Sequence, residues 1–537
     1  MLASTTKISG RSLIGSRQGS AGGEFQYATD PTNGQRLEPA FSAPSAEEVE
    51  LAVQMAADAF PAFRRTSGIE RARLLRKIAE NIETITPDIV ERAGKETALP
   101  QARLQSETAR TCGQLRLFAQ VAEDGSWVNA RIDRADSSRK PLPKPDIRSM
   151  LHPLGPVVVF GASNFPLAFS VAGGDTASAL AGGNPVIVKA HAAHPGTSEL
   201  VGHAVQEAVR DCGLPEGVFS LLFGSGTQVG TKLMKHPLVK AGGFTGSRIA
   251  GRTLMDIAAS RPEPIPFYAE MSSTNPVFIL PGVLREKREQ IAAGLHGSFT
   301  LGAGQFCTKP GMVFLPQGAE ASQLAQELSQ LVSGSAPFHL LTKTIHDSYA
   351  SAIAKRKSLD HVSVVAEAPC SGVEGFAAGS LVFETDAETF LGSNLESEIF
   401  GPTTLLVHHS SHAQVIAIAH SLEGHLTATI HGTEQDLRDF ADLIAVLETK
   451  VGRLIFNGFP TGVEVTHAMV HGGPYPSTSD GRSTSVGTQA IFRFTRLVCY
   501  QNFPDTALPN ELQDSNPLGL WRMIDGQMSR DPILRAA

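Results

Sequence analysis

The amino-acid sequence predicts an α/β protein with two α/β domains in series behind a helical N-terminal segment. Three observations lead to this fold class. The chain has 537 residues, too many for a single hydrophobic core. From Gly155 onward, short runs rich in Val, Ile and Phe alternate with helix-like stretches, and a second alternating set follows Cys307. Such alternation is typical of parallel sheets covered by helices on both faces.

The segment before Gly155 reads as four helices and an arm. Ser45 and Glu48 form a capping box ahead of a run with helical spacing. Residues 68–83 form a second amphipathic pattern, and Thr86-Pro87 opens a third helix with proline at its first position. A fourth pattern covers residues 103–121. Residues 127–150 are polar and rich in proline, which predicts an arm or hairpin outside the core.

The strands of the two domains are bounded by Gly or Pro. The first set comprises "GPVVVFGA", "NPVIVKA" and "GVFSLLFG", and the second comprises "GMVFLP", "HVSVVAE", "GSLVFETD", "GPTTLLVHH", "LTATIHG" and "GRLIFNG". We therefore divide the chain into a first domain (residues 1–126 and 151–272), a second domain (273–484), and an arm with a C-terminal wrap (127–150 and 485–537).

Composition excludes several classes of protein. Apolar residues make up 42% and charged residues 18%, as in globular proteins, and the net charge is −7 without a basic run for nucleic acid or anionic lipid. No signal-peptide core or membrane span is expected. Five scattered cysteines without a C-x-x-C pair argue against a disulfide framework or a zinc site. A reduced, cytoplasmic protein is expected, with no metal.

Glycine-containing turns after two strands indicate a phosphate-binding site. "FGSGTQVG" is one residue longer than the dinucleotide fingerprint, whereas "FTGSRIAG" places Gly246, Ser247 and Gly251 at a helix start. Lys189 ends the strand "NPVIVKA", where it would meet a phosphate or ribose. The alternatives stay open: glycine at a strand-to-helix turn is often there because a side chain would not fit, and lysines often extend along a surface.

Three polar residues stand in apolar or small-residue surroundings: Asn164 after a strand, Glu270 at the end of another, and Cys307 in "FTLGAGQFCTKPG". Each alone has a structural explanation, as a turn residue, a solvated carboxylate or an inert buried thiol. Together they supply a nucleophile, an amide donor for an oxyanion and a base for water, which is what acyl chemistry requires.

The whole set of motifs resembles the aldehyde dehydrogenase superfamily from about Ser45 to Pro517. The motifs that carry the resemblance are "GASNFPLAF", "GNPVIVKAH", "GFTGSRIAG", "YAEMSSTNPVFIL", "GAGQFCTKPG" and "ESEIFGP". "KAHAAHPGTSE", "GGPYPSTSDGRSTSVGTQAIFRF" and "VCYQNFPDTALP" are similar to the branch with 2,5-dioxopentanoate (α-ketoglutarate semialdehyde) dehydrogenases. The resemblance implies a Rossmann-type cofactor domain, a catalytic domain and an oligomerisation arm that builds a homodimer or homotetramer.

The resemblance also implies a mechanism. Cys307 attacks the aldehyde carbon, and the Asn164 amide and the Cys307 backbone N–H hold the oxyanion. Hydride transfer to NAD(P) then leaves a thioester, and Glu270 activates the water that hydrolyses it to a carboxylic acid. Alternatives are a dehydrogenase for a fatty or sugar-derived aldehyde, a coenzyme A-acylating variant, and a catalytically silent relative that binds a ligand or serves a structural role.

The cofactor residues follow from the same resemblance. Lys189 and Ser247 would hold the adenosine ribose and phosphates, and Glu398 and Phe400 would position the nicotinamide ribose and ring. Two positions depart from the family pattern. Met271 replaces the usual leucine, a volume-conserving change. Ala192 stands where NAD-preferring relatives carry a ribose-binding glutamate, so we expect NADP to be preferred over NAD.

A keto-acid substrate would need a cationic or amide-rich clamp for its carboxylate. Arg110 and Gln114 lie four residues apart on a predicted helix and would share one face toward the substrate tunnel. The alternative for Arg110 is a solvated arginine or a pair with Glu107.

Overall fold

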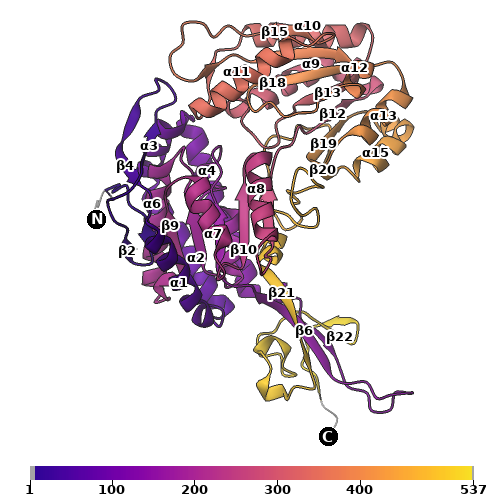
Figure 1. Cartoon of the computed structure of the whole chain (residues 1–537). Helices are drawn as coiled ribbons and strands as arrows, with labels where there is room; N and C mark the ends of the chain where they lie inside the picture. Colours follow the sequence, from indigo (N-terminus) through magenta and orange to yellow (C-terminus); the bar gives the residue numbers. More distant parts are fainter. Residues whose placement is uncertain (1–6, 535–537) are drawn as a thin grey trace.

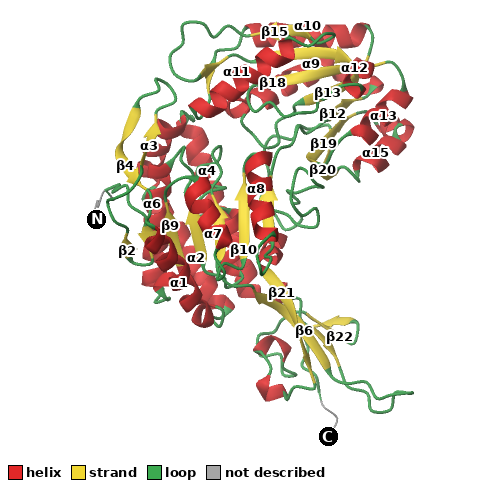
Figure 2. Ribbon diagram, viewed as in Figure 1, coloured by secondary structure: helices red, strands yellow, loops and turns green. Residues whose placement is uncertain are grey.

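The computed structural model describes residues 7–534 and shows two α/β lobes with an arm that projects away from both (Figure 1). The first lobe holds the N-terminal helices and one sheet, and the second holds the other large sheet. Helices cover the sheets in both lobes (Figure 2). The predicted α/β fold class is confirmed. Among residues 7–534 we find no helix with the length and apolar composition to cross a bilayer.

The four predicted N-terminal helices are present as α1 (Ala46–Phe63), α2 (Gly68–Thr84), α3 (Thr86–Thr97) and α4 (Gln101–Asp124). The capping box of Ser45 and Glu48 forms as predicted, and Ser67 with Glu70 forms a second one at α2. Helices α2 and α4 pack closely against each other. They bury apolar faces that join the core beneath the first sheet.

The first sheet has the strand order β11-β10-β7-β8-β9-β1-β2. Five of its strands are parallel: β7 (Val157–Phe160), β8 (Val186–Lys189), β9 (Phe219–Leu222), β10 (Ala241–Thr245) and β11 (Phe267–Glu270). Along β7, Val157 and Val159 enter one core while Val158 and Phe160 enter the other. Both faces are therefore buried, as a near-continuous apolar strand requires. Its helices are α5 (Gly174–Ala181), α6 (Pro195–Asp211), α7 (Thr231–Lys235) and α8 (Arg248–Ala259).

Four short N-terminal strands were not predicted. β1 (Leu13–Ile14) and β2 (Arg17–Gln18) extend the first sheet, with β1 antiparallel to β9, and β3 (Phe25–Thr29) pairs with β4 (Arg36–Ser42). Each is short, and only the pairing of β1 with β9 joins distant parts of the chain, so these strands carry little periodic pattern.

The second sheet has the order β15-β17-β18-β13-β12-β19-β20 and is parallel except for β15. Every predicted strand after Cys307 is present. The strands of this sheet are β12 (Val277–Ile279), which precedes Cys307, and then β13 (Met312–Pro316), β15 (Ser363–Glu367), β17 (Leu381–Asp386), β18 (Thr403–His409), β19 (His425–His431) and β20 (Val451–Phe456). Helices α9 (Pro281–Thr300), α10 (Ala319–Ser333), α11 (Lys343–Lys357), α12 (Ala387–Leu391), α13 (His412–Ser421), α14 (Glu434–Asp439) and α15 (Ala441–Leu447) accompany them, with a small sheet of β14 (Phe338–His339) and β16 (Ala377–Ala378).

The predicted arm and C-terminal wrap share a five-stranded sheet. It consists of β21 (Thr495–Gln501), β6 (Ile147–Pro153), β5 (Arg131–Asp133), β22 (Arg522–Ile524) and β23 (Gln527–Ser529), and it extends below the first lobe (Figure 1). Each of the three larger sheets falls within one predicted part of the chain, except that β6 runs past residue 150 to Pro153. The domain boundaries themselves remain predictions.

Candidate active site

The polar residues of the first lobe gather at the carboxyl edge of its sheet. Lys189 ends β8 and Glu270 ends β11, and they pair in register with Phe160 and Thr245 of the neighbouring strands. Asn164 follows β7 in the chain. Because parallel strands end at the same edge, residues distant in the sequence meet there, where open α/β sheets bind ligands.

Cys307 lies in a tight turn after α9. Gly302, Ala303 and Gly304, which precede it in the chain, have positive φ values of 57°, 59° and 66°. A Cβ at Gly304 would lie 2.2 Å from the carbonyl oxygen of Gly401. Glycine at this position therefore lets the turn that carries Cys307 touch the loop "ESEIFGP", which carries Glu398 and Phe400.

Asn275 fixes this turn, a role that was not predicted. Its side-chain Nδ2 donates to the carbonyl oxygens of Cys307 and Lys309, both at 2.9 Å, and its Oδ1 accepts from Ser273 Oγ at 2.9 Å. The residue is fully buried. The position of the thiol therefore depends on a side chain at the start of the second sheet.

Asn164 lies against the same turn. Its Nδ2 donates to the carbonyl oxygen of Gln305 at 2.8 Å. The buried Glu107 of α4 holds the following loop by accepting from the backbone N–H groups of Leu167 and Ala168, both at 3.0 Å. The structure thus brings Asn164 close to Cys307, while its part in oxyanion binding stays a prediction.

Glu270 and Cys307 meet at a third residue, His471. Nε2 of His471 lies 3.0 Å from Glu270 Oε1 and is hydrogen bonded to Cys307 Sγ at 3.5 Å. Ser485 Oγ donates to Glu270 Oε2 at 2.8 Å. His471 was not predicted: it stands directly before the stretch "GGPYPSTSDGRSTSVGTQAIFRF", which was read only as a branch marker, and a lone histidine in a loop carries no local signal.

The electrostatics of this cluster separate the two titrating groups. Burial raises the pKa of the Cys307 thiol well above its ordinary value, and the Glu270 carboxylate adds to the shift. Burial also works to raise the pKa of Glu270, but His471 and the hydrogen bond from Ser485 outweigh it, so that pKa lies below its ordinary value. The resting site therefore holds a thiol beside a carboxylate, and the carboxylate is the available base.

The residues predicted to bind the cofactor line the same edge. Lys189 is 7% exposed, its ammonium has no ion-pair partner among residues 7–534, and burial lowers its pKa to about 8. Ser247 caps α8 by accepting from the backbone N–H of Ala250, and Ala192 is exposed nearby in the chain after β8. A buried ammonium without an ion-pair partner among residues 7–534 and a helix N-terminus at Ser247 would both suit a phosphorylated dinucleotide.

Close packing joins the turn "FTGSRIAG" to the end of β11, which carries Glu270. A Cβ at Gly251 would lie 2.8 Å from both Cγ and Sδ of Met271, and Gly246 donates its backbone N–H to the carbonyl oxygen of Glu270 at 3.1 Å. On the other side, burial raises the pKa of Glu398 while the Lys309 ammonium opposes the shift.

A cavity of about 410 Å³ leads to Cys307. Arg110 lines it, as predicted, and so do Arg103 and Arg453, which the sequence did not point to. Gln114 is not among the lining residues. It lies buried against Gly174, where its amide nitrogen would touch a Cβ at 2.9 Å, so the shared helix face does not bring it to the cavity.

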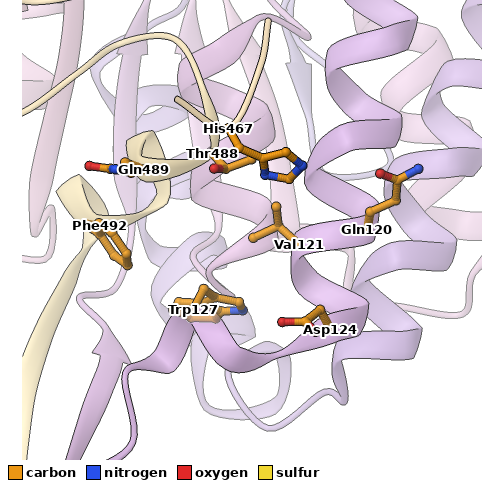
Figure 3. Close-up of a pocket in the computed structure, with 8 residues that line it drawn as sticks. All are labelled: Gln120, Val121, Asp124, Trp127, His467, Thr488, Gln489 and Phe492. Atoms are coloured by element: carbon orange, nitrogen blue, oxygen red, sulfur yellow. The ribbon is translucent and has the colours of Figure 1, made fainter. Parts of the chain in front are cut away.

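A second cavity, of about 420 Å³, lies where α4 ends and the arm begins (Figure 3). None of the predicted site residues lines it. Its wall is formed by Gln120, Val121, Asp124, Trp127, His467, Thr488, Gln489 and Phe492.

Comparison with known proteins identifies the family. The family model described as "Aldehyde dehydrogenase family" matches residues 20–497. The chain belongs to the aldehyde dehydrogenase family. It is 48% identical over 523 residues to "Alpha-ketoglutaric semialdehyde dehydrogenase 2" of Azospirillum brasilense, covering 97% of this chain and 99% of that one. It is 44% identical over 493 residues to "Alpha-ketoglutaric semialdehyde dehydrogenase" of Acinetobacter baylyi, covering 91% and 93%.

Solved structures of aldehyde dehydrogenases share the fold. The aldehyde dehydrogenase of Brucella melitensis biovar abortus 2308 has a TM-score of 0.78 at 21% identity, covering 94% of this chain and 100% of that one. PnpE of Pseudomonas sp. WBC-3, solved in complex with nicotinamide adenine dinucleotide, has a TM-score of 0.78 at 22% identity, covering 91% and 97%. These structures show the shared fold, while membership of the family makes the chain an NAD(P)-dependent oxidoreductase that acts on aldehydes.

Proposed function

We propose that the enzyme oxidises α-ketoglutarate semialdehyde to 2-oxoglutarate through a thioester on Cys307. The observation that carries this proposal is the cavity in front of the thiol, where two guanidinium groups have no carboxylate partner. The names of the relatives at 48% and 44% identity support the same substrate.

Arg110 and Arg453 supply the positive charge. Among residues 7–534 neither forms an ion pair: Arg110 donates to the carbonyl oxygen of Val463 at 3.3 Å, and Arg453 donates to that of Pro460 at 2.9 Å. Nη1 of Arg110 and Nε of Arg453 are buried without a partner in this part of the chain. Burial lowers the pKa of both groups, the mark of a desolvated cation that an anion would stabilise.

The third arginine has a different role. Arg103 is paired with Glu107 and lies over the rings of Phe165 and Phe306, at 4.6 Å and 5.3 Å from their centroids. It therefore shapes the wall of the cavity. The aromatic rings suit the two methylene groups of a five-carbon semialdehyde. A fatty aldehyde would leave the two free guanidinium groups buried against an alkyl chain, which is costly.

The residues at the centre would act in sequence. Glu270 takes the proton of the Cys307 thiol, and the sulfur forms a bond to the aldehyde carbon. Asn164 Nδ2 and the Cys307 backbone N–H donate to the oxygen that becomes negative. When bound, the nicotinamide of NAD(P) accepts the hydride. After Glu270 has released the thiol proton to solvent, it takes a proton from water as the water oxygen bonds to the thioester carbon, and the C–S bond breaks to release the acid.

For the cofactor, the proposal includes a preference for NADP over NAD. Lys189 and Ser247 would hold the ribose and phosphates, Gly246 and Gly251 allow their approach, and Glu398 and Phe400 would position the nicotinamide end, with Met271 packed beneath. The exposed Ala192 places no carboxylate near a 2′-phosphate. We expect kcat/KM for NADP to equal or exceed that for NAD, and Ala192→Glu to shift the ratio toward NAD by about tenfold, since like charges repel. A large NAD advantage in the unaltered enzyme would refute this preference.

We also propose that the enzyme is cytoplasmic and forms a homodimer or homotetramer. The arm supports the assembly. Leu497 on β21 is 62% exposed and Trp521 beside β22 is 47% exposed, so the arm presents apolar side chains to a second copy. Light scattering on the purified enzyme measures the assembly, and a monomer would contradict this part of the proposal.

Substrate selectivity tests the central proposal. The measurement is kcat/KM for α-ketoglutarate semialdehyde against pentanal, a neutral aldehyde of equal length. Arg110→Gln and Arg453→Gln should each lower the value for the semialdehyde by about 10- to 100-fold, the worth of a hydrogen bond to a charged group, and leave pentanal little changed. The control is Arg76→Gln. Arg76 lies on α2, pairs with Glu123 of α4 and does not line the cavity. An unchanged preference in both cavity variants would reject the substrate.

A further inference from the structure

His471 lies between the two groups that exchange a proton in the proposed chemistry. It is 1% exposed and comes from the loop after β20. Its Nε2 makes an aligned hydrogen bond with Cys307 Sγ at 3.5 Å, while Glu270 Oε1 lies 3.0 Å away and has no aligned donor among residues 7–534. The imidazole thus faces the sulfur and stands beside the carboxylate.

The other ring nitrogen decides which tautomer is present. Nδ1 of His471 is buried and has no hydrogen-bond partner within residues 7–534. A buried N–H without a partner is rarer and costlier than a buried acceptor without one, so the single proton of the neutral ring belongs on Nε2. With its proton on Nε2, His471 is a donor toward Cys307 and cannot be the base that removes the thiol proton.

We propose that His471 is a catalytic residue that stabilises the Cys307 thiolate by donating its Nε2–H to the sulfur. The inference rests on the thioester chemistry proposed above and is independent of which aldehyde is oxidised.

The proton balance of each step fits this role. When Glu270 takes the thiol proton, the electron pair of the S–H bond stays on sulfur, and Nε2–H donates to the resulting thiolate. When the thioester is hydrolysed, the electron pair of the C–S bond returns to sulfur and meets the same donor.

Other charges also act on the sulfur and must stay constant in a test. Arg110 of α4 and Arg453 of β20 favour the thiolate, whereas Glu270 of β11 and Glu398 of the "ESEIFGP" loop oppose it. Glu270 is the one of these four that contacts His471, at 3.0 Å from Nε2, and Ser485 Oγ holds its other oxygen at 2.8 Å in every His471 variant.

Two amide variants separate a donor from a base and from a space-filling ring. The amide nitrogen of glutamine stands as many bonds from Cβ as Nε2 of histidine does, so His471→Gln keeps a donor at the sulfur but has no proton acceptor of comparable strength. His471→Asn has the same chemistry in a shorter side chain that stops at the position of Nδ1. The control is His467→Gln in the same loop, an exposed histidine at the second cavity (Figure 3).

The test measures how fast iodoacetamide alkylates Cys307 as a function of pH, without aldehyde or cofactor, by mass spectrometry of the Cys307 peptide. Near neutral pH, His471→Asn should slow alkylation by about 10- to 100-fold and move the pH profile to higher pH, whereas His471→Gln and His467→Gln should stay near the unaltered enzyme. Equal, slow rates in the Gln and Asn variants would overturn the proposal in favour of a base, and equal, normal rates would show a space-filling role. Since no substrate is present, a wrong substrate assignment cannot produce any of these results.

Discussion

The centre around Cys307 and the cavity in front of it differ in how their polar groups are satisfied. At the centre, Asn275 donates to two carbonyl oxygens of the nucleophile turn, and Ser485 and His471 approach the two oxygens of Glu270. In the cavity, Arg110 and Arg453 keep buried N–H groups without a partner among the described residues. The turn of Cys307 and one oxygen of Glu270 are therefore held by protein donors before a substrate arrives, although Glu270 Oε1 and His471 Nδ1 have no aligned partner among the described residues. The unpartnered N–H groups of the cavity remain available to a substrate.

Removal of the nucleophile should have the largest effect. We expect Cys307→Ala to lower kcat by about 10⁴-fold or more, because no other thiol lies near the carboxylate base. NAD(P)H absorbance with α-ketoglutarate semialdehyde measures the loss. Cys370→Ala, which alters an exposed thiol, serves as the control and should retain full activity. Turnover near the normal rate in Cys307→Ala would show that the fixed centre does not carry the reaction.

The fixed character of the centre predicts a cost in stability when Asn275 is shortened. Asn275→Ala leaves the carbonyl oxygens of Cys307 and Lys309 without their donor, so the free energy of unfolding should fall by about 1–3 kcal/mol. Urea denaturation measures it, with Asn33→Ala at an exposed turn as the control. Equal midpoints for both variants would show that the turn holds itself without Asn275.

Lys189 gives a smaller effect that depends on pH. Its pKa of about 8 means that the ammonium loses its proton as pH rises through that value, so a phosphate or ribose partner loses its cation there. The Kd for NADP should therefore increase above about pH 8, by at most tenfold per pH unit. Fluorescence titration of the cofactor measures it, and Lys189→Met should bind weakly with a flat profile. A slope that persists in that variant would assign the titration to another group.

Local signals in the sequence were enough for much of the fold and for part of the site. A capping box predicted α1, apolar runs predicted most strands of both large sheets, and small-residue motifs pointed to Cys307, Glu270 and Asn164. His471 was missed because it lies 164 residues from Cys307 and only the fold brings them together. Arg453 was missed for the same reason.

Helical spacing explains one success and one failure on α4. Arg110 and Gln114 do share a face of the helix, yet only Arg110 reaches the cavity, since Gln114 lies one turn further on against Gly174. Spacing fixes which side chains are neighbours on a helix, whereas the neighbouring elements determine what each side chain meets. The strands β1 to β4 escaped prediction because they are short and show little alternation of apolar and polar residues, although most of their pairing is local.

The most direct test of the account traps the acyl group on the thiol. At a pH high enough for solvent hydroxide to ionise the Cys307 thiol, Glu270→Gln should form the thioester without its carboxylate base but hydrolyse it slowly, because the amide cannot take a proton from water. After the variant is mixed with NADP and α-ketoglutarate semialdehyde, we expect a burst of one NADPH per site and the mass of one acyl group on the Cys307 peptide. A burst without that mass, or acylation of a different residue, would contradict the assignment of Cys307 as nucleophile and Glu270 as the base for hydrolysis.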